Sequence, residues 1–160
     1  MIKVDGLKDM TIEERYKYMT LMVGGQLKTE KDLIANLSNI SAVLNSGLED
    51  INWVGFYLMK DGELVLGPFQ GLPACNRIKV GEGVCGNAVK FRKTLRIENV
   101  HEFDGHIACD SASNSEIVIP LIKADSVIGV LDIDSPLYSR FSEVDQKKLS
   151  SIVSLIEEYI

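Results

Sequence analysis

The sequence contains no apolar run that approaches the roughly 20 residues needed to span a bilayer as a helix. Its amino terminus also lacks the charged-then-apolar layout of a secretion signal. Lysine and arginine never form a cluster longer than a near-triplet, and the formal net charge is −6. Such a chain should repel phosphate backbones, so we expect neither nucleic acid nor a membrane among its partners. We expect a cytoplasmic location.

Cysteine is scarce, and the three that occur are Cys75, Cys85 and Cys109. In a chain expected to be intracellular, an odd number of cysteines argues against a fixed set of structural disulfides. Inert buried thiols, a metal site and redox chemistry remain as interpretations. Each cysteine lies in a loop or at a helix entry rather than in a strong apolar run, which weakly disfavours a purely packing role. Cys85, between Val84 and Gly86, is the one that we expect to be buried.

The length and composition fit one folded unit. With 160 residues, of which 46% are hydrophobic, the chain can bury a core without disulfides or metals. It shows no internal repeat and no low-complexity tract. We therefore expect a single domain over residues 1–160, with residues 1–10 as an N-terminal arm.

Helical periodicity covers residues 11–24, residues 30–45 and a closing segment that starts at Ser142. Ser142 and Asp145 have the spacing of a capping box, which marks a helix start. A glycine-rich stretch introduces a short helix over about 81–93. Its glycines match no phosphate-binding fingerprint, so we interpret them as turns.

The period changes to two from residue 51, and strands are predicted at 51–59, 63–70, 94–97, 116–123 and 126–134. A short extended piece covers residues 76–80. Asp61-Gly62 and Ala124-Asp125 are typical turns for two hairpins. The order of elements predicts an α+β domain in which helices pack on an antiparallel sheet.

The first strand carries side chains that could line a pocket. Alternation places Trp53, Gly55 and Tyr57 on one face, with Val54 and its neighbours on the other. A glycine between two aromatic residues leaves room for a small ligand. Burial in the core is the ordinary alternative for such aromatic side chains.

Acidic residues gather at one end of the second hairpin. Ile128, Val130, Asp132 and Asp134 share one face of its last strand, so this face changes from core to cleft along its length. Pairing with Glu116 on the opposite strand brings three carboxylates together. Crowded carboxylates raise one another's pKa, so one can stay protonated near neutral pH and act as an acid. Solvation at a strand end is the alternative for each of them taken singly.

Cys109 lies in the loop that leads to Glu116. A thiolate beside a protonated carboxyl suits the reduction of an oxidised heteroatom, because the carboxyl protonates the departing oxygen while sulfur attacks. A zinc site competes with this interpretation, since His106 precedes Cys109 by three residues and the other two cysteines complete four potential ligands. The gap of ten between Cys75 and Cys85 is unlike the tight pairs of structural zinc sites, so we expect no metal.

Several blocks of the sequence together resemble the free methionine-(R)-sulfoxide reductases, a family built on a GAF domain. The blocks lie at 52–58 (NWVGFYL), 66–71 (LGPFQG), 74–75 (AC), 81–86 (GEGVCG), 106–120 and 129–135 (GVLDIDS). The resemblance implies a six-stranded antiparallel sheet flanked by helices, commonly in a homodimer formed through terminal helices. It implies free methionine (R)-sulfoxide as the substrate and thioredoxin as the reductant, with no cofactor.

The resemblance also implies roles for the cysteines. Cys109 matches the nucleophile, which attacks the sulfoxide sulfur and becomes a sulfenic acid. Cys75 matches the resolving cysteine, which forms a disulfide with Cys109 that thioredoxin reduces. Cys85 matches a third cysteine with a catalytic or alternative resolving role.

Glu116, Asp132 and Asp134 match the family's acidic residues, which bind and polarise the sulfoxide oxygen. Trp53 matches the aromatic wall for the substrate methyl group, and Tyr57 is added because it lies on the same predicted face. The alternative is a non-catalytic GAF domain that binds a small molecule or senses thiol oxidation. A sensor needs no resolving thiol, so the cysteine set favours the enzyme.

Overall fold

The computed structural model describes residues 6–105 and 111–160. Its helices are η1 (Leu7–Asp9), α1 (Ile12–Thr29), α2 (Leu33–Gly47), α3 (Gly83–Phe91), η2 (Val100–Glu102) and α4 (Glu143–Tyr159), where η marks a 3-10 turn. Its strands are β1 (Trp53–Lys60), β2 (Glu63–Gly71), β3 (Arg77–Lys79), β4 (Leu95–Ile97), β5 (Ser115–Lys123) and β6 (Ser126–Ser135). Each predicted helix and strand therefore has its counterpart.

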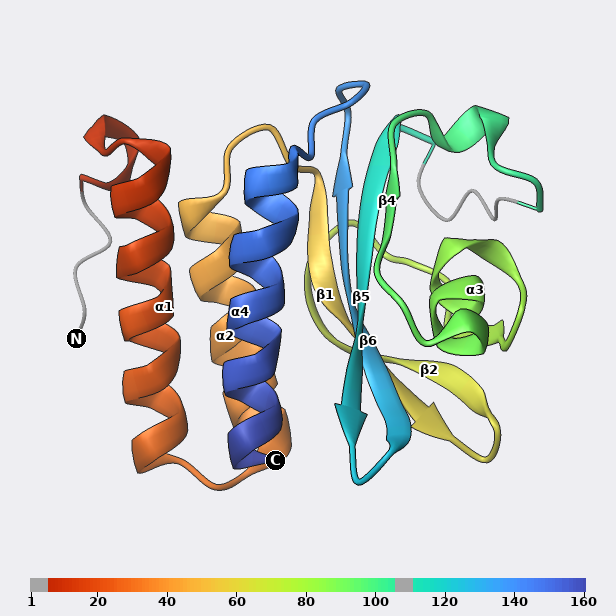
Figure 1. Cartoon of the computed structure of the whole chain (residues 1–160), viewed down its shortest axis with the longest axis horizontal. Helices are drawn as coiled ribbons and strands as arrows, with labels where there is room; N and C mark the ends of the chain where they lie inside the picture. Colours follow the sequence, from red (N-terminus) through yellow and green to blue (C-terminus); the bar gives the residue numbers. More distant parts are fainter. Residues whose placement is uncertain (1–5, 106–110) are drawn as a thin grey trace.

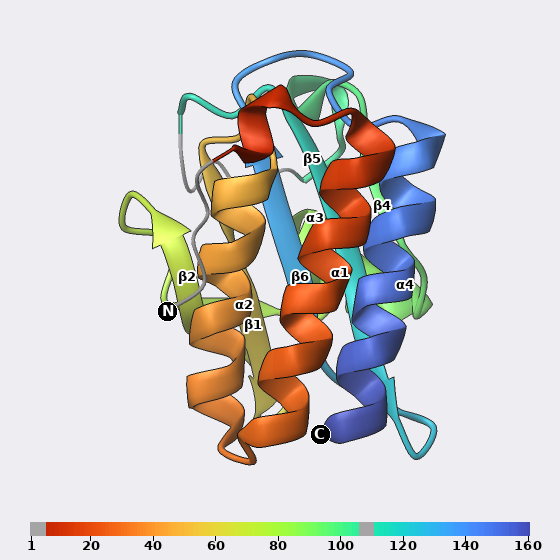
Figure 2. The same cartoon turned by 90° about the vertical axis from the view of Figure 1, so that its left-hand side faces the viewer.

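The six strands form one antiparallel sheet in the order β3-β2-β1-β6-β5-β4. α2 packs on β1 and β2, α4 packs on β5, and α1 lies outside on these two helices (Figures 1 and 2). α3 covers the opposite face of the sheet. The predicted α+β architecture with a six-stranded antiparallel sheet is confirmed. Within the described ranges, no helix combines the length and apolar character required to cross a membrane.

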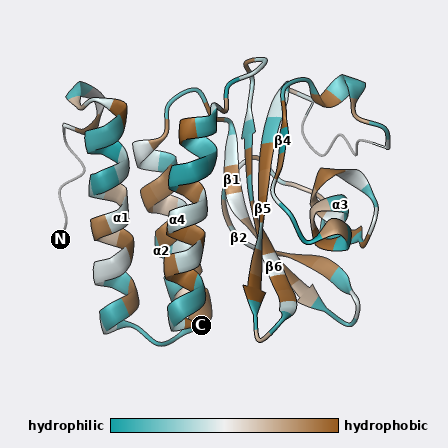
Figure 3. Ribbon diagram, viewed as in Figure 1, coloured by the Kyte–Doolittle hydropathy of each residue, from teal (hydrophilic) through white to brown (hydrophobic). Residues whose placement is uncertain are grey.

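The face of the sheet toward α2 and α4 carries the larger apolar core. Val54, Phe56 and Leu58 of β1 point into it, as their alternation predicts, and are at most 8% exposed. Each such side chain stabilises the fold by roughly 1.5–3 kcal/mol on burial. Figure 3 shows the result, with hydrophobic strands at the centre and hydrophilic patches on the outer sides of the helices. This core is the scaffold for the opposite face.

The face toward α3 carries a second, smaller core. Trp53 and Tyr57 of β1 point into it together with Cys85 of α3, so the alternation prediction for β1 holds on both faces. α3 lies close to the sheet because Gly86 has no side chain. A Cβ atom there would lie 2.2 Å from the carbonyl oxygen of Lys79.

The prediction for one face of β6 is wrong at a single position. Ile128 packs against the helix-side core, and Val127 packs against the α3 side, which reverses their expected directions. The pairing of β5 with β6 shifts register between Leu121 and Ile122. An extra residue at such a bulge turns the preceding side chains to the other face. Val130 and Asp132, which follow the bulge, face α3 as predicted.

α1 continues beyond the predicted end near Gly24 and reaches Thr29. The two glycines at 24 and 25 each disfavour helix by about 1 kcal/mol relative to alanine. Burial of Val23 and Leu27, both 0% exposed, offsets this cost. Tertiary packing therefore decides the length of this helix, whereas its start at the Thr11 capping box follows from local sequence.

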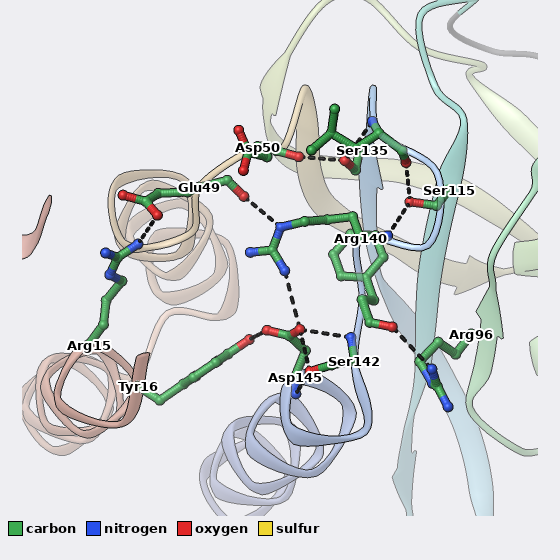
Figure 4. Close-up of polar contacts among 12 residues, drawn as sticks. Arg15, Tyr16, Glu49, Asp50, Arg96, Ser115, Ser135, Arg140, Ser142 and Asp145 are labelled. Carbon is green, nitrogen blue, oxygen red and sulfur yellow. Dashed lines mark hydrogen bonds and ion pairs between the residues drawn. The ribbon is translucent and has the colours of Figure 1, made fainter. Parts of the chain in front are cut away.

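Asp145 joins three parts of the molecule (Figure 4). It forms the predicted capping box with Ser142 at the start of α4. Its carboxylate also accepts a hydrogen bond from the Tyr16 hydroxyl of α1 at 2.6 Å and from Arg140 Nη1 at 3.2 Å. The capping prediction is confirmed, and the link to α1 is an addition that the sequence pattern does not indicate.

Two serines anchor the ends of β5 and β6 at the same end of the sheet (Figure 4). Ser115 donates to the carbonyl of Leu137 at 2.6 Å and accepts the backbone N–H of Arg140 at 3.2 Å. Ser135, its partner across the two strands, donates to the carbonyl of Asp50. These bonds fix the backbone immediately beside Glu116.

Candidate active site

Three elements bring Cys85, Glu116 and Asp132 together on the α3 face of the sheet. Cys85 comes from the first turn of α3, Glu116 from the start of β5 and Asp132 from β6. One side-chain atom of each lies within 4.8 Å of the others. The three residues are 3%, 6% and 6% exposed, respectively, so the cluster is shielded from water. Asp134, half-buried, pairs directly across from Glu116. The predicted meeting of the carboxylates is confirmed.

Burial raises the pKa of Glu116 well above its ordinary value, and the neighbouring Asp132 and Asp134 raise it further. Burial also raises the pKa of Asp132, to about 6, although hydrogen bonds with Cys85 and Glu116 act in the opposite direction. Both shifts favour a proton on this pair of carboxyls, and the larger shift falls on Glu116. The raised pKa of Glu116 agrees in direction with the predicted protonated carboxyl, and burial contributes more to it than crowding does.

Cys85 is a free, buried thiol. Its sulfur lies 4.0 Å from Glu116 Oε1, at hydrogen-bonding distance for sulfur. Burial, followed by the charges of Asp132 and Glu116, raises the pKa of this thiol well above its ordinary value. Since the thiolate is the reactive form of cysteine, Cys85 is a poor nucleophile in this state.

One oxygen of Asp132, Oδ1, is buried with no hydrogen-bond partner among the described residues. A buried acceptor of this kind is costly, and it offers a binding point for a donor group of a ligand. The spacing of the cluster would also suit a divalent cation. A cation would first have to displace protons from Glu116 and Cys85, whose raised pKa values oppose this. Proton transfer is the chemistry that the cluster favours.

An aromatic stack forms the wall of the site next to the carboxylates. Trp53 stacks on Tyr57 with ring centroids 5.9 Å apart, and on Phe69 of β2 at 5.2 Å. The expected free space above Gly55 does not exist, because Phe69 and Trp53 fill it. A Cβ atom at position 55 would lie 2.3 Å from Phe69 Cβ.

The sequence reasoning overlooked Phe69. Its place opposite Gly55 depends on a register shift between Gly55 and Tyr57 in the pairing of β1 with β2. A regular hairpin built on Asp61-Gly62 would put a different residue there. The shift has no sequence signal that we can identify.

Cys75 lies in the loop that follows β2, and its sulfur is in a disulfide. Its backbone carbonyl accepts a hydrogen bond from the Tyr57 hydroxyl at 3.0 Å. The indole N–H of Trp53 donates to the carbonyl of Leu72 in the same loop at 3.1 Å. The two aromatic residues expected to contact a substrate thus also hold the loop of Cys75. Cys109 and His106 lie outside the described residues.

Comparison with known proteins gives consistent matches. Residues 37–160 match the family model of the GAF domain. The free methionine-R-sulfoxide reductase of Escherichia coli is 56% identical over 131 residues, which cover 82% of this chain and 79% of that protein. The Staphylococcus aureus fRMsr in complex with substrate has a TM-score of 0.86 at 51% identity, over 90% of this chain and 94% of that chain. The Neisseria meningitidis free methionine-R-sulfoxide reductase in complex with its substrate has a TM-score of 0.87 at 41% identity, over 90% and 87%.

Proposed function

The chain belongs to the GAF domain family and, within it, to the free methionine-R-sulfoxide reductases, and we propose that it reduces free methionine (R)-sulfoxide to methionine. The observation that carries this proposal is the buried Cys85–Glu116–Asp132 cluster, together with a neighbouring loop whose Cys75 is in a disulfide. The cluster supplies a proton near neutral pH, and the loop supplies a thiol. Sulfoxide reduction needs both.

Glu116 is the proposed general acid. It holds its proton in a shielded site, where a hydrogen bond to the sulfoxide oxygen is not weakened by water. Asp132 and Asp134 keep the proton on Glu116 by repelling its charged form. Asp132 and Asp134 also orient the polar end of the substrate, and Trp53 packs against its methyl group.

Cys109 is the proposed nucleophile. Of the other two cysteines, Cys85 is held as a neutral thiol, and Cys75 is the proposed resolving residue. The thiolate of Cys109 attacks the sulfoxide sulfur, and the sulfoxide oxygen takes the proton of Glu116. The oxygen then passes to the Cys109 sulfur as its bond to the methionine sulfur and the bond between the two sulfurs break, so methionine leaves with two more electrons and Cys109 becomes a sulfenic acid. The thiol of Cys75 then displaces this oxygen as water and forms the Cys75–Cys109 disulfide.

Thioredoxin is the proposed reductant of that disulfide, and the cytoplasm, where thiols are kept reduced, is the proposed compartment. We also propose a homodimer that forms through the terminal helices. The exposed Ile12 and Leu21 of α1 support this, because they offer apolar surface on the outermost helix.

Substrate entry is proposed to follow reduction of the disulfide. In the disulfide form, Trp53 and Tyr57 are each 2% exposed, and Glu116 is 6% exposed. A substrate therefore has little access to any of them.

A thioredoxin-coupled assay with free (R)-, free (S)- and protein-bound methionine sulfoxide tests the function. We expect NADPH consumption with the free (R) form and at least tenfold less with the other two. Equal turnover of both free epimers would contradict the proposed specificity. Binding of the (R) form without turnover would instead indicate a non-catalytic GAF domain that senses the metabolite or the thiol state.

A further inference from the structure

The loop around Cys75 is held through its backbone. Its carbonyl groups at Leu72, Cys75 and Asn76 accept hydrogen bonds from Trp53 Nε1 (3.1 Å), the Tyr57 hydroxyl (3.0 Å) and the Leu66 N–H (2.9 Å), respectively. The first two donors are side chains from one face of β1. Three anchors over five residues leave this segment little freedom to move relative to the sheet.

The Tyr57 anchor acts on the cysteine itself. Its ring is 2% exposed and stacks on Trp53, so the position of its hydroxyl is set by the packed core. Burial and the nearby charge of Asp132 raise the pKa of Tyr57 far above its ordinary value. The hydroxyl therefore keeps its proton and donates at every pH at which the protein functions.

We propose that Tyr57 is a positioning residue for the resolving step: its hydroxyl holds the Cys75 backbone where the Cys75 sulfur meets the oxidised Cys109. The inference rests on the proposed function, and it replaces the substrate contact expected for Tyr57 from the sequence. In the step concerned, the Cys75 sulfur bonds to the Cys109 sulfur, the S–O bond of the sulfenic acid breaks, and the oxygen leaves as water. No further reactant is needed.

Positioning matters here because the reaction joins two thiols of one chain. When the folded protein already holds the reacting groups in place, the reaction step itself loses less conformational entropy. A backbone residue that is free to move loses about 1–2 kcal/mol of conformational entropy when it is fixed. Loss of the Tyr57 hydroxyl should therefore slow disulfide formation about tenfold relative to attack on the sulfoxide.

The experiment uses the reduced full chain, one equivalent of free methionine (R)-sulfoxide and the variant Tyr57→Phe. Methionine release and the loss of the Cys75 thiol are followed in the same quenched samples, with dimedone to trap the sulfenic acid. We expect thiol loss to slow about tenfold relative to methionine release, with accumulation of the trapped sulfenic acid. Tyr16→Phe is the matched control, because it removes another buried tyrosine hydroxyl, the one that binds Asp145. Its two rates should equal those of the wild type.

A second measurement is independent of the sulfoxide. The equilibrium constant for disulfide formation, measured in glutathione buffers, should fall about tenfold in Tyr57→Phe, which corresponds to about 30 mV for a two-electron couple. Trp53→Phe, which removes the Leu72 anchor, should shift it in the same direction by less. The inference is overturned if Tyr57→Phe leaves the equilibrium unchanged, or if it slows methionine release as much as thiol loss. A wild type that releases no methionine would refute the proposed function, and the equilibrium measurement would still test the anchor.

Discussion

Replacement of Glu116 by glutamine is the most direct test of the acid in the site. The amide side chain in the variant Glu116→Gln would have the same shape and could still donate an N–H hydrogen bond, but it has no proton to transfer. Proton transfer from a positioned acid is typically worth about 10²–10⁴-fold in rate. Because the hydrogen bond to the sulfoxide oxygen survives, we expect the lower part of this range, a loss of about 10²-fold in methionine release.

The pH dependence sharpens this expectation. In the folded protein the pKa of Glu116 lies well above its ordinary value of 4.5. Methionine release by the wild type should therefore decline once the pH exceeds that raised pKa, and Glu116→Gln should lack this decline. The raised pKa of Glu116 also affects the free energy of unfolding, and this effect is unfavourable at neutral pH. The folded state holds the proton more tightly than the unfolded state, so Glu116 lowers stability increasingly as the pH rises above 4.5. Glu116→Gln should then be at least as stable as the wild type at pH 7.

Single-turnover methionine release between pH 5 and 9, together with urea unfolding at pH 7, provides the assay. Glu63→Gln is the control, because Glu63 pairs with Arg77 on the surface at 2.6 Å, far along β2 from the site. A release rate of Glu116→Gln within threefold of the wild type would refute the role of Glu116 as the acid. A slow but strongly destabilised variant would instead assign Glu116 a structural role.

Four further predictions follow from the same geometry. Asp132→Asn removes a charge that raises the pKa of Glu116, so the alkaline decline of methionine release should move to lower pH; an unmoved decline would disprove the coupling. Burial alone would raise the pKa of Asp145, but hydrogen bonds from Tyr16 and Ser142 and the charge of Arg140 together lower it, so Asp145→Asn should cost about 2–4 kcal/mol in urea unfolding at pH 7. The contribution of this ionised group is present above its unfolded pKa and is lost as the pH falls through its lower folded pKa, so the difference between the two proteins should shrink under acid conditions. Gly55→Ala should cost about 1–3 kcal/mol because its Cβ overlaps Phe69, whereas Gly25→Ala, with open space in α1, should stabilise the helix by up to about 1 kcal/mol. Calorimetry should detect methionine binding to the reduced chain and at least tenfold weaker binding to the disulfide form; equal affinities would disprove entry after reduction.

Features that depend on neighbouring residues could be predicted from the sequence. The capping boxes at Thr11 and Ser142 form as their spacing indicates, since a side chain meets the backbone three residues away. The turn at Asp61-Gly62 pairs Lys60 with Glu63 as expected. Alternation along β1 also predicts both of its faces correctly. These outcomes require information from only a few consecutive residues.

Features that depend on register or on distant partners could not be predicted. The bulges reverse Ile128 and place Phe69 over Gly55, because one extra residue in a strand shifts the pairing of all residues on its far side from the turn. The hydrogen bond between Tyr16 and Asp145 joins residues 129 positions apart, and no local pattern encodes it.

The chemical groups of the site follow from the order of amino acids alone: three cysteines, a carboxylate at the start of one strand and two more at the end of its partner. The meeting of the carboxylates needs the register shift between Leu121 and Ile122 as well, because the hairpin turn by itself would pair Glu116 with Ile133 instead of Asp134. Their protonation is also decided by the tertiary structure, since it depends on how the layers pack. α3 covers the hairpin and places Cys85 beside Glu116, and the burial that results raises the pKa values of both. The raised pKa values are therefore a property of the packed layers, since desolvation arises only when distant segments exclude water from the same charge.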